Sequence, residues 1–139
     1  FRIINRKCIR IYNFKSKKSK QTCFGFLHKP YCGYCDRMIE VLSDDWISTK
    51  IKKDFVFVDI YIKDTGTITY KNFKGTRREF AQFLGYDFYP TSIFINKHSE
   101  VVYVQPGYQD DFKYLNLLDY ISSTSYEEIG IEEFEELNK

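Results

Sequence analysis

The sequence predicts one α/β domain in which helices cover both faces of a mixed β-sheet. Apolar segments rich in β-formers alternate with segments whose apolar residues repeat at helical spacing. Their order is strand, helix, strand, insert, helix, strand, strand, helix, and this order places helices on both faces of a mixed sheet. The length of 139 residues allows one substantial core but not two.

The first half of the predicted domain holds two strands with a long helix between them. Residues 22–28 are β-formers without proline and are apolar on both faces, as expected of a central strand. Residues 31 to about 50 are predicted to form one helix, and residues 54–62 form the second apolar strand. The helix prediction depends on apolar residues at roughly helical spacing: Met38, Ile39, Leu42 and Trp46.

The middle of the chain contains an insert and a short, well-delimited helix. Residues 63–75 are interpreted as an inserted loop, with a small hairpin as one possible form. The helix over 76–84 begins at Thr76, and Glu79 follows three residues later, which is the spacing of a capping box. Gly85 is expected to end this helix.

The last third of the chain predicts a hairpin and two helices. Strands over 91–96 and 100–105 flank a short polar turn and form the hairpin. Asp110 or Asp111 caps the next helix, which runs to about residue 122. An acidic helix over about 125–137 closes the chain.

Charge is concentrated at the two ends of the chain, although the net charge is only +2. Residues 2–20 carry eight Lys or Arg and no acid, whereas residues 127–136 carry six Glu and no base. The two solvated ends can attract each other, or the basic arm can touch an anionic membrane surface. Nucleic acid is not expected as a partner, because the basic run lacks a recognisable binding module. We assign 1–21 as a basic extension with a possible strand and 22–137 as the domain.

The apolar runs are far shorter than the ~20 residues that a bilayer span requires. No signal peptide is visible, and a chain that begins with Phe rather than Met is typical of a mature or trimmed product. The compartment therefore stays open at this point. The four cysteines are too few for a scaffold built from disulfides at this length.

The main chemical signal is Cys32-Gly33-Tyr34-Cys35, at the junction between the first strand and the first helix. Two cysteines at this spacing can close a disulfide ring within one helical turn. At a helix N-terminus, unpaired N–H groups and the helix dipole stabilise the reactive thiolate. The motif therefore predicts a redox pair, with half a zinc site or a structural cysteine pair as the alternatives. A zinc site needs four ligands, and the remaining cysteines and histidines form no second pair: Cys8, Cys23, His28 and His98.

A second signal is Phe88-Tyr89-Pro90-Thr91, which leads directly into the strand over 91–96. Proline cannot donate a ladder hydrogen bond and is normally excluded from central strands. At the start of a strand it marks a turn, with either an ordinary trans bond or a cis bond.

Together these motifs resemble the thioredoxin-like proteins, and a third motif, Pro106-Gly107-Tyr108 before a helix, adds to the likeness. More narrowly, the chain resembles the exported thioredoxin-related proteins of the SoxW type and the C-terminal domain of the thiol:disulfide interchange protein DsbD. That likeness covers about residues 22–137. Three features support it. The insert with Asn72-Phe73-Lys74-Gly75 precedes Arg78-Glu79-Phe80-Ala81, and Gly107-Tyr108 precedes Phe112, Leu115, Leu118 and Tyr120. An extra segment, from Tyr126 to Glu135, follows the usual end of the fold.

The resemblance implies a thioredoxin fold with an insert before the third helix and an extra C-terminal helix. It implies a thiol:disulfide oxidoreductase that reduces protein disulfides through Cys32 and Cys35, with no metal and no cofactor beyond that redox-active pair. It also implies a cis-Pro90 beside the pair, in a loop that offers the backbone of Tyr89 to an extended substrate. The expected substrate contacts are Tyr31, Gly33, Tyr34, Tyr89 and Pro90.

The resemblance also suggests partners and rival functions. Disulfide-containing proteins are the expected substrates. The expected electron donor is a dithiol protein, and a membrane-embedded donor is one of the forms considered. We expect a monomer in an exported or periplasmic location, with a cytoplasmic location as the alternative. The rival functions are net disulfide oxidation or isomerisation, and a non-catalytic binding or chaperone module.

Two positions depart from the thioredoxin pattern. The dipeptide between the cysteines is Gly-Tyr rather than Gly-Pro, and the position of the buried acid of thioredoxin, six residues before the first cysteine, holds Phe26. That acid is thought to assist proton transfer from the second cysteine, so its absence leaves the proton acceptor unassigned and the direction of electron flow undetermined. Asp36, Lys29 and His28 are each expected to be surface residues.

Three further residues carry structural expectations. Cys23 is expected to pack in the core as a small apolar residue. Cys8 is expected to be free and unreactive, with a disulfide to Cys23 or a crosslink to a partner as the alternatives. Asp59, inside an apolar strand, is expected at a strand edge or on an exposed face.

Overall fold

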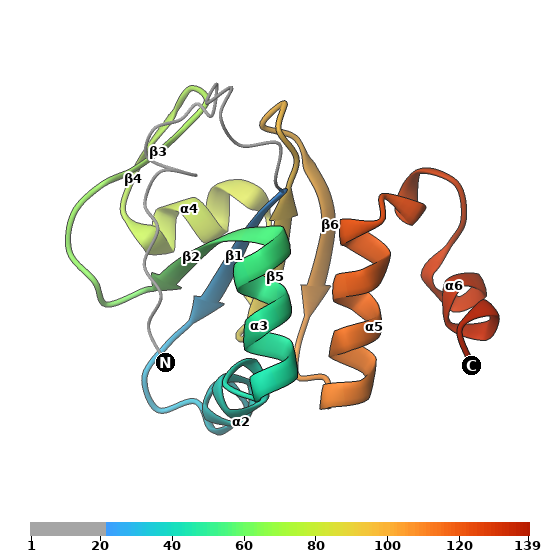
Figure 1. Ribbon diagram of the computed structural model, residues 1–139. Helices are drawn as coiled ribbons and strands as arrows, with labels where there is room; N and C mark the ends of the chain where they lie inside the picture. The colour runs from blue at the N-terminus through green and yellow to red at the C-terminus, as the bar shows by residue number, and fades with distance from the viewer. Residues whose placement is uncertain (1–21) are drawn as a thin grey trace.

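A four-stranded mixed sheet forms the centre of the structure, a computed structural model that describes residues 22–139. The predicted basic extension, its possible strand and Cys8 lie outside the described residues. The strand order is β2-β1-β5-β6, with β1 parallel to β2 and the other two pairs antiparallel (Figure 1). The strands are β1 (Thr22–His28), β2 (Phe55–Tyr61), β5 (Thr91–Ile95) and β6 (Val101–Pro106). This arrangement confirms the predicted mixed sheet and its terminal hairpin.

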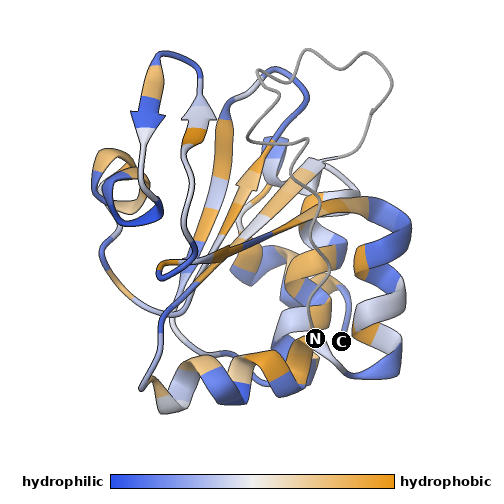
Figure 2. Cartoon of the chain, turned by 90° about the vertical axis from the view of Figure 1, so that its left-hand side faces the viewer, coloured by the Kyte–Doolittle hydropathy of each residue, from blue (hydrophilic) through white to orange (hydrophobic). Residues whose placement is uncertain are grey.

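Helices cover both faces of the sheet, as predicted. One face carries α4 together with the small second sheet, and the other carries α2, α3 and α5 (Figure 1). Hydrophobic residues are concentrated on the strands and on the helix sides turned toward them (Figure 2). The helices are α2 (Gly33–Leu42), α3 (Asp45–Asp54), α4 (Arg77–Leu84) and α5 (Asp111–Ser122).

The prediction of one helix over 31–50 is wrong, because the chain forms α2 and α3 with a break between them. The Asp44 side chain accepts hydrogen bonds from the backbone N–H groups of Trp46 and Ile47, at 3.0 and 3.3 Å, and so starts a new helix. Trp46, which contributed to the predicted apolar spacing, is 79% exposed, and Ile47 and Ile51 are buried instead. The new helix turns a different set of residues toward the sheet.

The insert forms a small hairpin, the more ordered of the two forms expected for it, with strands β3 (Ile68–Tyr70) and β4 (Phe73–Gly75). The capping box at the start of α4 is confirmed, with reciprocal hydrogen bonds between Thr76 and Glu79. Gly85 ends this helix at a φ of 86°, a left-handed conformation that favours glycine.

The closing acidic helix predicted over 125–137 is also divided. A 3-10 turn, η1 (Ser125–Glu127), precedes α6 (Ile131–Leu137), and Gly130 caps the second helix. The Tyr120 hydroxyl of α5 donates to the Ile129 carbonyl at 2.7 Å, and its ring lies 5.3 Å from that of Phe134. The chain must turn between these two contacts, so it cannot continue as one straight helix.

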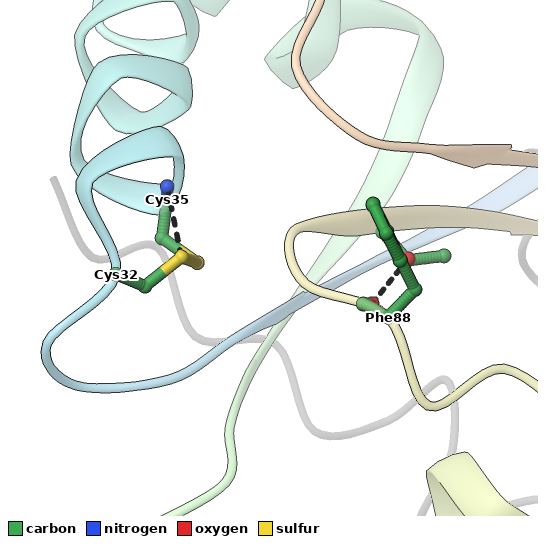
Figure 3. Close-up of a disulfide and its surroundings, with 4 residues drawn as sticks. Cys32, Cys35 and Phe88 are labelled. Atoms are coloured by element: carbon green, nitrogen blue, oxygen red, sulfur yellow. Dashed lines mark hydrogen bonds between the residues drawn. A yellow bond between two sulfur atoms is a disulfide. The ribbon is translucent and has the colours of Figure 1, made fainter.

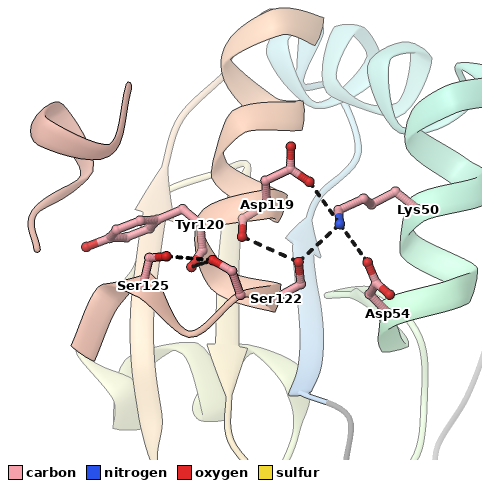
Figure 4. Close-up of polar contacts among 7 residues, drawn as sticks. Lys50, Asp54, Asp119, Tyr120, Ser122 and Ser125 are labelled. Carbon is pink, nitrogen blue, oxygen red and sulfur yellow. Dashed lines mark hydrogen bonds and ion pairs between the residues drawn. The ribbon is translucent and has the colours of Figure 1, made fainter. Parts of the chain in front are cut away.

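A polar cluster on the outer side of the helical layer joins α3 to α5 (Figure 4). Lys50 Nζ lies 2.6 Å from Asp54 Oδ2, 2.8 Å from Asp119 Oδ1 and 3.1 Å from Ser122 Oγ. Because the Lys50 side chain is 22% exposed, the solvent weakens these ion pairs. Their main effect is to hold the two helices in one relative position.

Two other expectations are confirmed. Cys23 is buried in β1 among apolar side chains, and the Asp110 side chain caps α5 by accepting from the Lys113 N–H. Within the described part of the chain, no helix combines the length and the apolar character that crossing a membrane requires.

Candidate active site

The two cysteines of the motif form a disulfide at the beginning of α2 (Figure 3). Their Cα atoms are 5.2 Å apart. Cys32 is the N-cap residue of the helix, and its Sγ accepts a hydrogen bond from the Cys35 N–H at 3.1 Å. A thiolate at this sulfur would face an N–H donor and the positive end of the helix dipole, and both stabilise its negative charge.

The two sulfurs differ in their access to solvent. Cys32 is partly exposed, whereas Cys35 is 1% exposed because it lies on the side of α2 that faces the sheet, together with Met38 and Leu42. A substrate disulfide can therefore approach Cys32 but not Cys35. The structure places the two residues in unequal positions for disulfide exchange.

Aromatic side chains line the rim around the disulfide. Tyr31, directly before Cys32, is fully exposed and has a φ of 56°, which is unusual for a bulky residue. Tyr34, between the cysteines, is also exposed. The Arg37 guanidinium lies 4.6 Å from the ring centroid of Tyr108 and 5.6 Å from that of Tyr34, so it links α2 to the segment before α5.

The proline loop lies on the side toward which the sulfurs point (Figure 3). The Tyr89–Pro90 peptide bond is cis, and Pro90 is buried. The Pro90 carbonyl accepts from the Gly107 N–H at 2.7 Å, and the Thr91 hydroxyl donates to the Phe88 carbonyl. These bonds hold the loop, while the Phe88 side chain is exposed beside it.

The strand register explains why the loop and the disulfide meet. Leu27 near the end of β1 pairs with Thr91 at the start of β5, and β1 continues through a short loop into Cys32. The predicted contact residues Tyr31, Gly33 and Tyr34 therefore lie at the same end of the sheet as Tyr89 and Pro90. Phe88, Arg37 and Tyr108 were not among the predicted site residues. Phe88 stands next to the predicted Tyr89, whereas only the tertiary fold brings Tyr108 to Arg37.

The sequence expectation for His28 is wrong, and that for Asp59 is met only in part. His28 was expected at the surface and Asp59 at a strand edge or on an exposed face, yet both side chains are buried. Asp59 does lie on the edge strand β2, where a hydrogen bond joins its Oδ1 to Nε2 of His28. The parallel register brings them together, because Asp59 is opposite Phe26 and His28 is opposite Tyr61.

Lys29 and Asp36 are exposed, as expected. The Lys29 ammonium lies 5.3 Å from the ring centroid of Tyr89, at the edge of the proline loop. Burial, together with the negative charge of Asp87, raises the pKa of the Tyr89 hydroxyl, so this hydroxyl stays neutral at physiological pH. Among residues 22–139, no group of three or more His, Cys, Asp or Glu side chains is placed to hold a metal ion.

Comparisons with known proteins agree with this architecture. Residues 13–122 match the family model of the thioredoxin-like domain. A thioredoxin-fold protein from Helicobacter pylori superposes with a TM-score of 0.71 at 21% identity, covering 82% of this chain and 76% of that one. A thioredoxin from Thermus thermophilus gives 0.59 at 22% identity, covering 73% of each chain. An exposed lipoprotein thioredoxin from Streptococcus pneumoniae gives 0.55 at 19% identity, covering 76% of this chain and 88% of that one.

A search of curated protein sequences gave no significant match. At such low identities the structural likenesses establish the fold alone, and the narrower resemblance to the SoxW and DsbD types stays a prediction. The fold together with the Cys32–Cys35 pair supports thiol–disulfide redox activity. Because the family model spans most of the sequence, the chain belongs to the family of thioredoxin-like domains.

Proposed function

We propose that this protein is a thiol:disulfide oxidoreductase that reduces disulfides in other proteins. The observation that carries the proposal is the unequal placement of the two sulfurs. Cys32 is accessible at the helix N-terminus, and Cys35 is buried one helical turn further on. This is the arrangement that a two-step exchange requires, since one sulfur must meet the substrate and the other must wait behind it.

The reaction begins with the reduced protein. The Cys32 thiolate attacks one sulfur of the substrate disulfide, so that a mixed disulfide forms and the other substrate sulfur leaves as a thiolate. Cys35 then loses its proton and attacks Cys32 Sγ, which releases the second substrate thiolate. The two cysteines lose two electrons in forming their disulfide, and the substrate disulfide gains two electrons and two protons.

The substrate is proposed to bind between the rim of α2 and the proline loop. Tyr31, Gly33 and Tyr34 would contact it from one side, and Tyr89 and Pro90 from the other. An added Cβ on Gly33 would meet nothing within 4 Å, so the surface beside Cys32 is open to a partner. Tyr89 precedes β5, so its backbone lies outside the ladder of the sheet and is available for strand-like pairing with an extended segment.

A trapping experiment tests the proposal. In a background in which Cys8 is replaced by serine, a reduced Cys35→Ser protein is mixed with insulin, and adducts are separated on a non-reducing gel. We expect a covalent adduct through Cys32, because the residue that would release the substrate is missing. Cys23→Ser is the matched control, since Cys23 is buried in β1, and this variant should turn over without accumulating an adduct.

The opposite outcome is equally clear. If the protein lacking both Cys32 and Cys35 still reduced insulin at the wild-type rate, the proposal would be wrong. Tight peptide binding without turnover in the wild-type protein would instead support the non-catalytic binding module.

The direction of electron flow needs its own measurement. Equilibration of the Cys32–Cys35 pair with glutathione gives its reduction potential. A value near the ~ −270 mV of thioredoxin supports the proposed reductase, whereas a value near ~ −120 mV supports a net oxidase.

We propose that the protein is a monomer in an exported location. Its electron donor would be a dithiol protein, and a donor embedded in the membrane is one form of this proposal. The support for the location and donor is the sequence resemblance to exported thioredoxin-related proteins. Fractionation of the native cells with an antibody to this chain tests the location, and size-exclusion chromatography tests the monomer.

A further inference from the structure

The second step of the proposed exchange requires a base near Cys35. The thiolate is the nucleophile, and burial disfavours the charged thiolate relative to the neutral thiol. Cys35 is 1% exposed, so bulk water has little access to its proton. The sulfur can act quickly only if a group inside the protein accepts that proton.

The described residues contain a buried pair with the chemistry of a base and its orienting carboxylate. His28 Nε2 is hydrogen-bonded to Asp59 Oδ1. When the imidazole is neutral, this bond to the carboxylate keeps the proton on Nε2 and leaves a lone pair on Nδ1. Within the described part of the chain, Nδ1 makes no hydrogen bond of its own.

The fold brings this pair to the same end of the sheet as Cys35. Phe24, Phe26 and His28 alternate along β1, so their side chains are on one face, and His28 is the last residue of the strand. Phe24 and Phe26 belong to the same buried cluster as Met38 of α2. Cys35 shares the buried side of α2 with Met38, one turn nearer the helix start.

The connection between the two elements is short. Lys29, Pro30 and Tyr31 alone separate His28 from Cys32, and Figure 3 shows the strand running through this loop into the disulfide. Such a link limits how far the imidazole can lie from the first turn of α2. The imidazole and the buried sulfur therefore lie at one end of the same layer.

Aromatic rings enclose the imidazole on two sides. It lies between two aromatic rings, with centroids 5.0 Å from Phe26 and 4.9 Å from Tyr61. The titratable side chains in contact with it are Asp59 and Tyr61 on β2, and Lys29 follows it directly in the loop. Lys29 turns its ammonium toward Tyr89 rather than toward the carboxylate.

We propose that His28, oriented by Asp59, accepts the Cys35 proton in the second step of exchange. The inference rests on the proposed function. The Cys35 S–H bond breaks and its proton goes to Nδ1 of His28. The Cys35 sulfur then bonds to Cys32 Sγ as the bond from Cys32 to the substrate breaks, and the departing substrate thiolate takes up a proton from His28 or from solvent. Asp59 is a positioning residue that keeps the ring in the required tautomer.

Single-turnover kinetics of His28→Gln separate the two chemical steps. The first step is followed in a Cys35→Ser background as formation of the insulin adduct, and we expect His28→Gln to leave its rate unchanged. The second step is followed with Cys35 present, and we expect the adduct to decay about 10²-fold more slowly at pH 7, the lower end of the usual range for general-base catalysis. The lost rate should return as the pH rises, because hydroxide replaces the missing base.

Matched controls address general effects on structure and charge. His98→Gln changes the other histidine, which is exposed in the β5–β6 turn, and Asp36→Asn changes an exposed acid next to Cys35. Both should behave as the wild type. Asp59→Asn keeps the shape of the pair and should slow the second step with the same pH dependence as His28→Gln.

Several outcomes would overturn the inference. If adduct decay in His28→Gln had the wild-type rate and pH profile, the assignment of His28 would fail while the proposed exchange would stand. If the Cys35→Ser protein with His28 intact formed no Cys32 adduct at all, both would fail.

A measurement on the unmodified protein covers the case in which neither variant folds. The titration of the His28 ring is followed by NMR in the disulfide and dithiol forms. We expect the midpoint of this titration to change on reduction, because the dithiol form carries an ionisable Cys35 thiol that the disulfide form lacks. An unchanged midpoint would overturn the inference without any substitution.

Discussion

A buried hydrogen bond between Tyr114 and Ser92 anchors the strand that follows the proline loop, and its removal gives a quantitative prediction. The Tyr114 hydroxyl of α5 lies 2.7 Å from the Ser92 hydroxyl of β5, and both residues are buried. Tyr114→Phe removes one hydroxyl and leaves the other without its partner. An unsatisfied buried hydroxyl costs about 1–3 kcal/mol, which is the expected loss in the free energy of unfolding at pH 7.

The same substitution changes the response to alkaline pH. Burial raises the pKa of Tyr114 far above its ordinary value, although the hydrogen bond to Ser92 opposes this shift. Because the folded-state pKa is higher than the unfolded-state value of about 10, the stability linked to the bound proton is fully present below pH 10. It is lost as the pH rises further, by about 1.4 kcal/mol per pH unit.

Urea denaturation of the wild type and of Tyr114→Phe between pH 7 and 11.5 tests both effects. The two stabilities should differ by about 1–3 kcal/mol at pH 7 and converge above pH 10, so that the variant becomes the more stable within about one to two pH units. Ser92→Ala and the double variant complete a double-mutant cycle. The stability lost in the double variant should be smaller than the sum of the losses in the two single variants. A difference between wild type and variant that stayed constant up to pH 11.5 would refute the reasoning.

Three smaller predictions concern local contacts. Thr76→Ala should lower the free energy of unfolding by about 1 kcal/mol through loss of the capping box, and an unchanged urea midpoint would contradict this. Lys50→Met should cost less than about 1 kcal/mol, because its bonds to Asp119 and its neighbours are partly solvated, and 1 M salt should shrink the loss; a larger, salt-independent loss would contradict a mainly orienting role. Tyr120→Phe should cost about 1 kcal/mol and speed amide hydrogen exchange around Ile129, whereas unchanged exchange would show that their hydrogen bond does not hold the C-terminal segment.

The local signals in the sequence predicted most of the fold. The strand over 22–28, the capping box at Thr76 and the helix end at Gly85 all depend on neighbouring residues. Each of these signals acts over a few positions, either through side-chain patterning or through hydrogen bonds to the nearby backbone. The cysteine motif belongs to the same class, because its spacing and its place before a helix can both be found along the chain.

The errors arose where a new helix start interrupts an otherwise continuous helical pattern. Trp46 fits the helical spacing of its neighbours, yet the Asp44 cap starts a new helix that turns Ile47 inward. The closing acidic segment fits one helix, but its contacts with Tyr120 and the break at Gly130 divide it. In both segments the choice depends on which residues meet the rest of the protein, and periodicity alone cannot decide that.

The sequence by itself determined the chemistry of the site: two cysteines at disulfide spacing before a helix, and a proline at the start of a strand. The tertiary structure decided which other groups share that site. His28 and Asp59 are 31 positions apart, and only the parallel pairing of β1 with β2 places the imidazole against the carboxylate. The physical reason is that a strand pattern shows whether a face is buried, whereas the strand register, set by the packing of the whole sheet, decides which residues meet there.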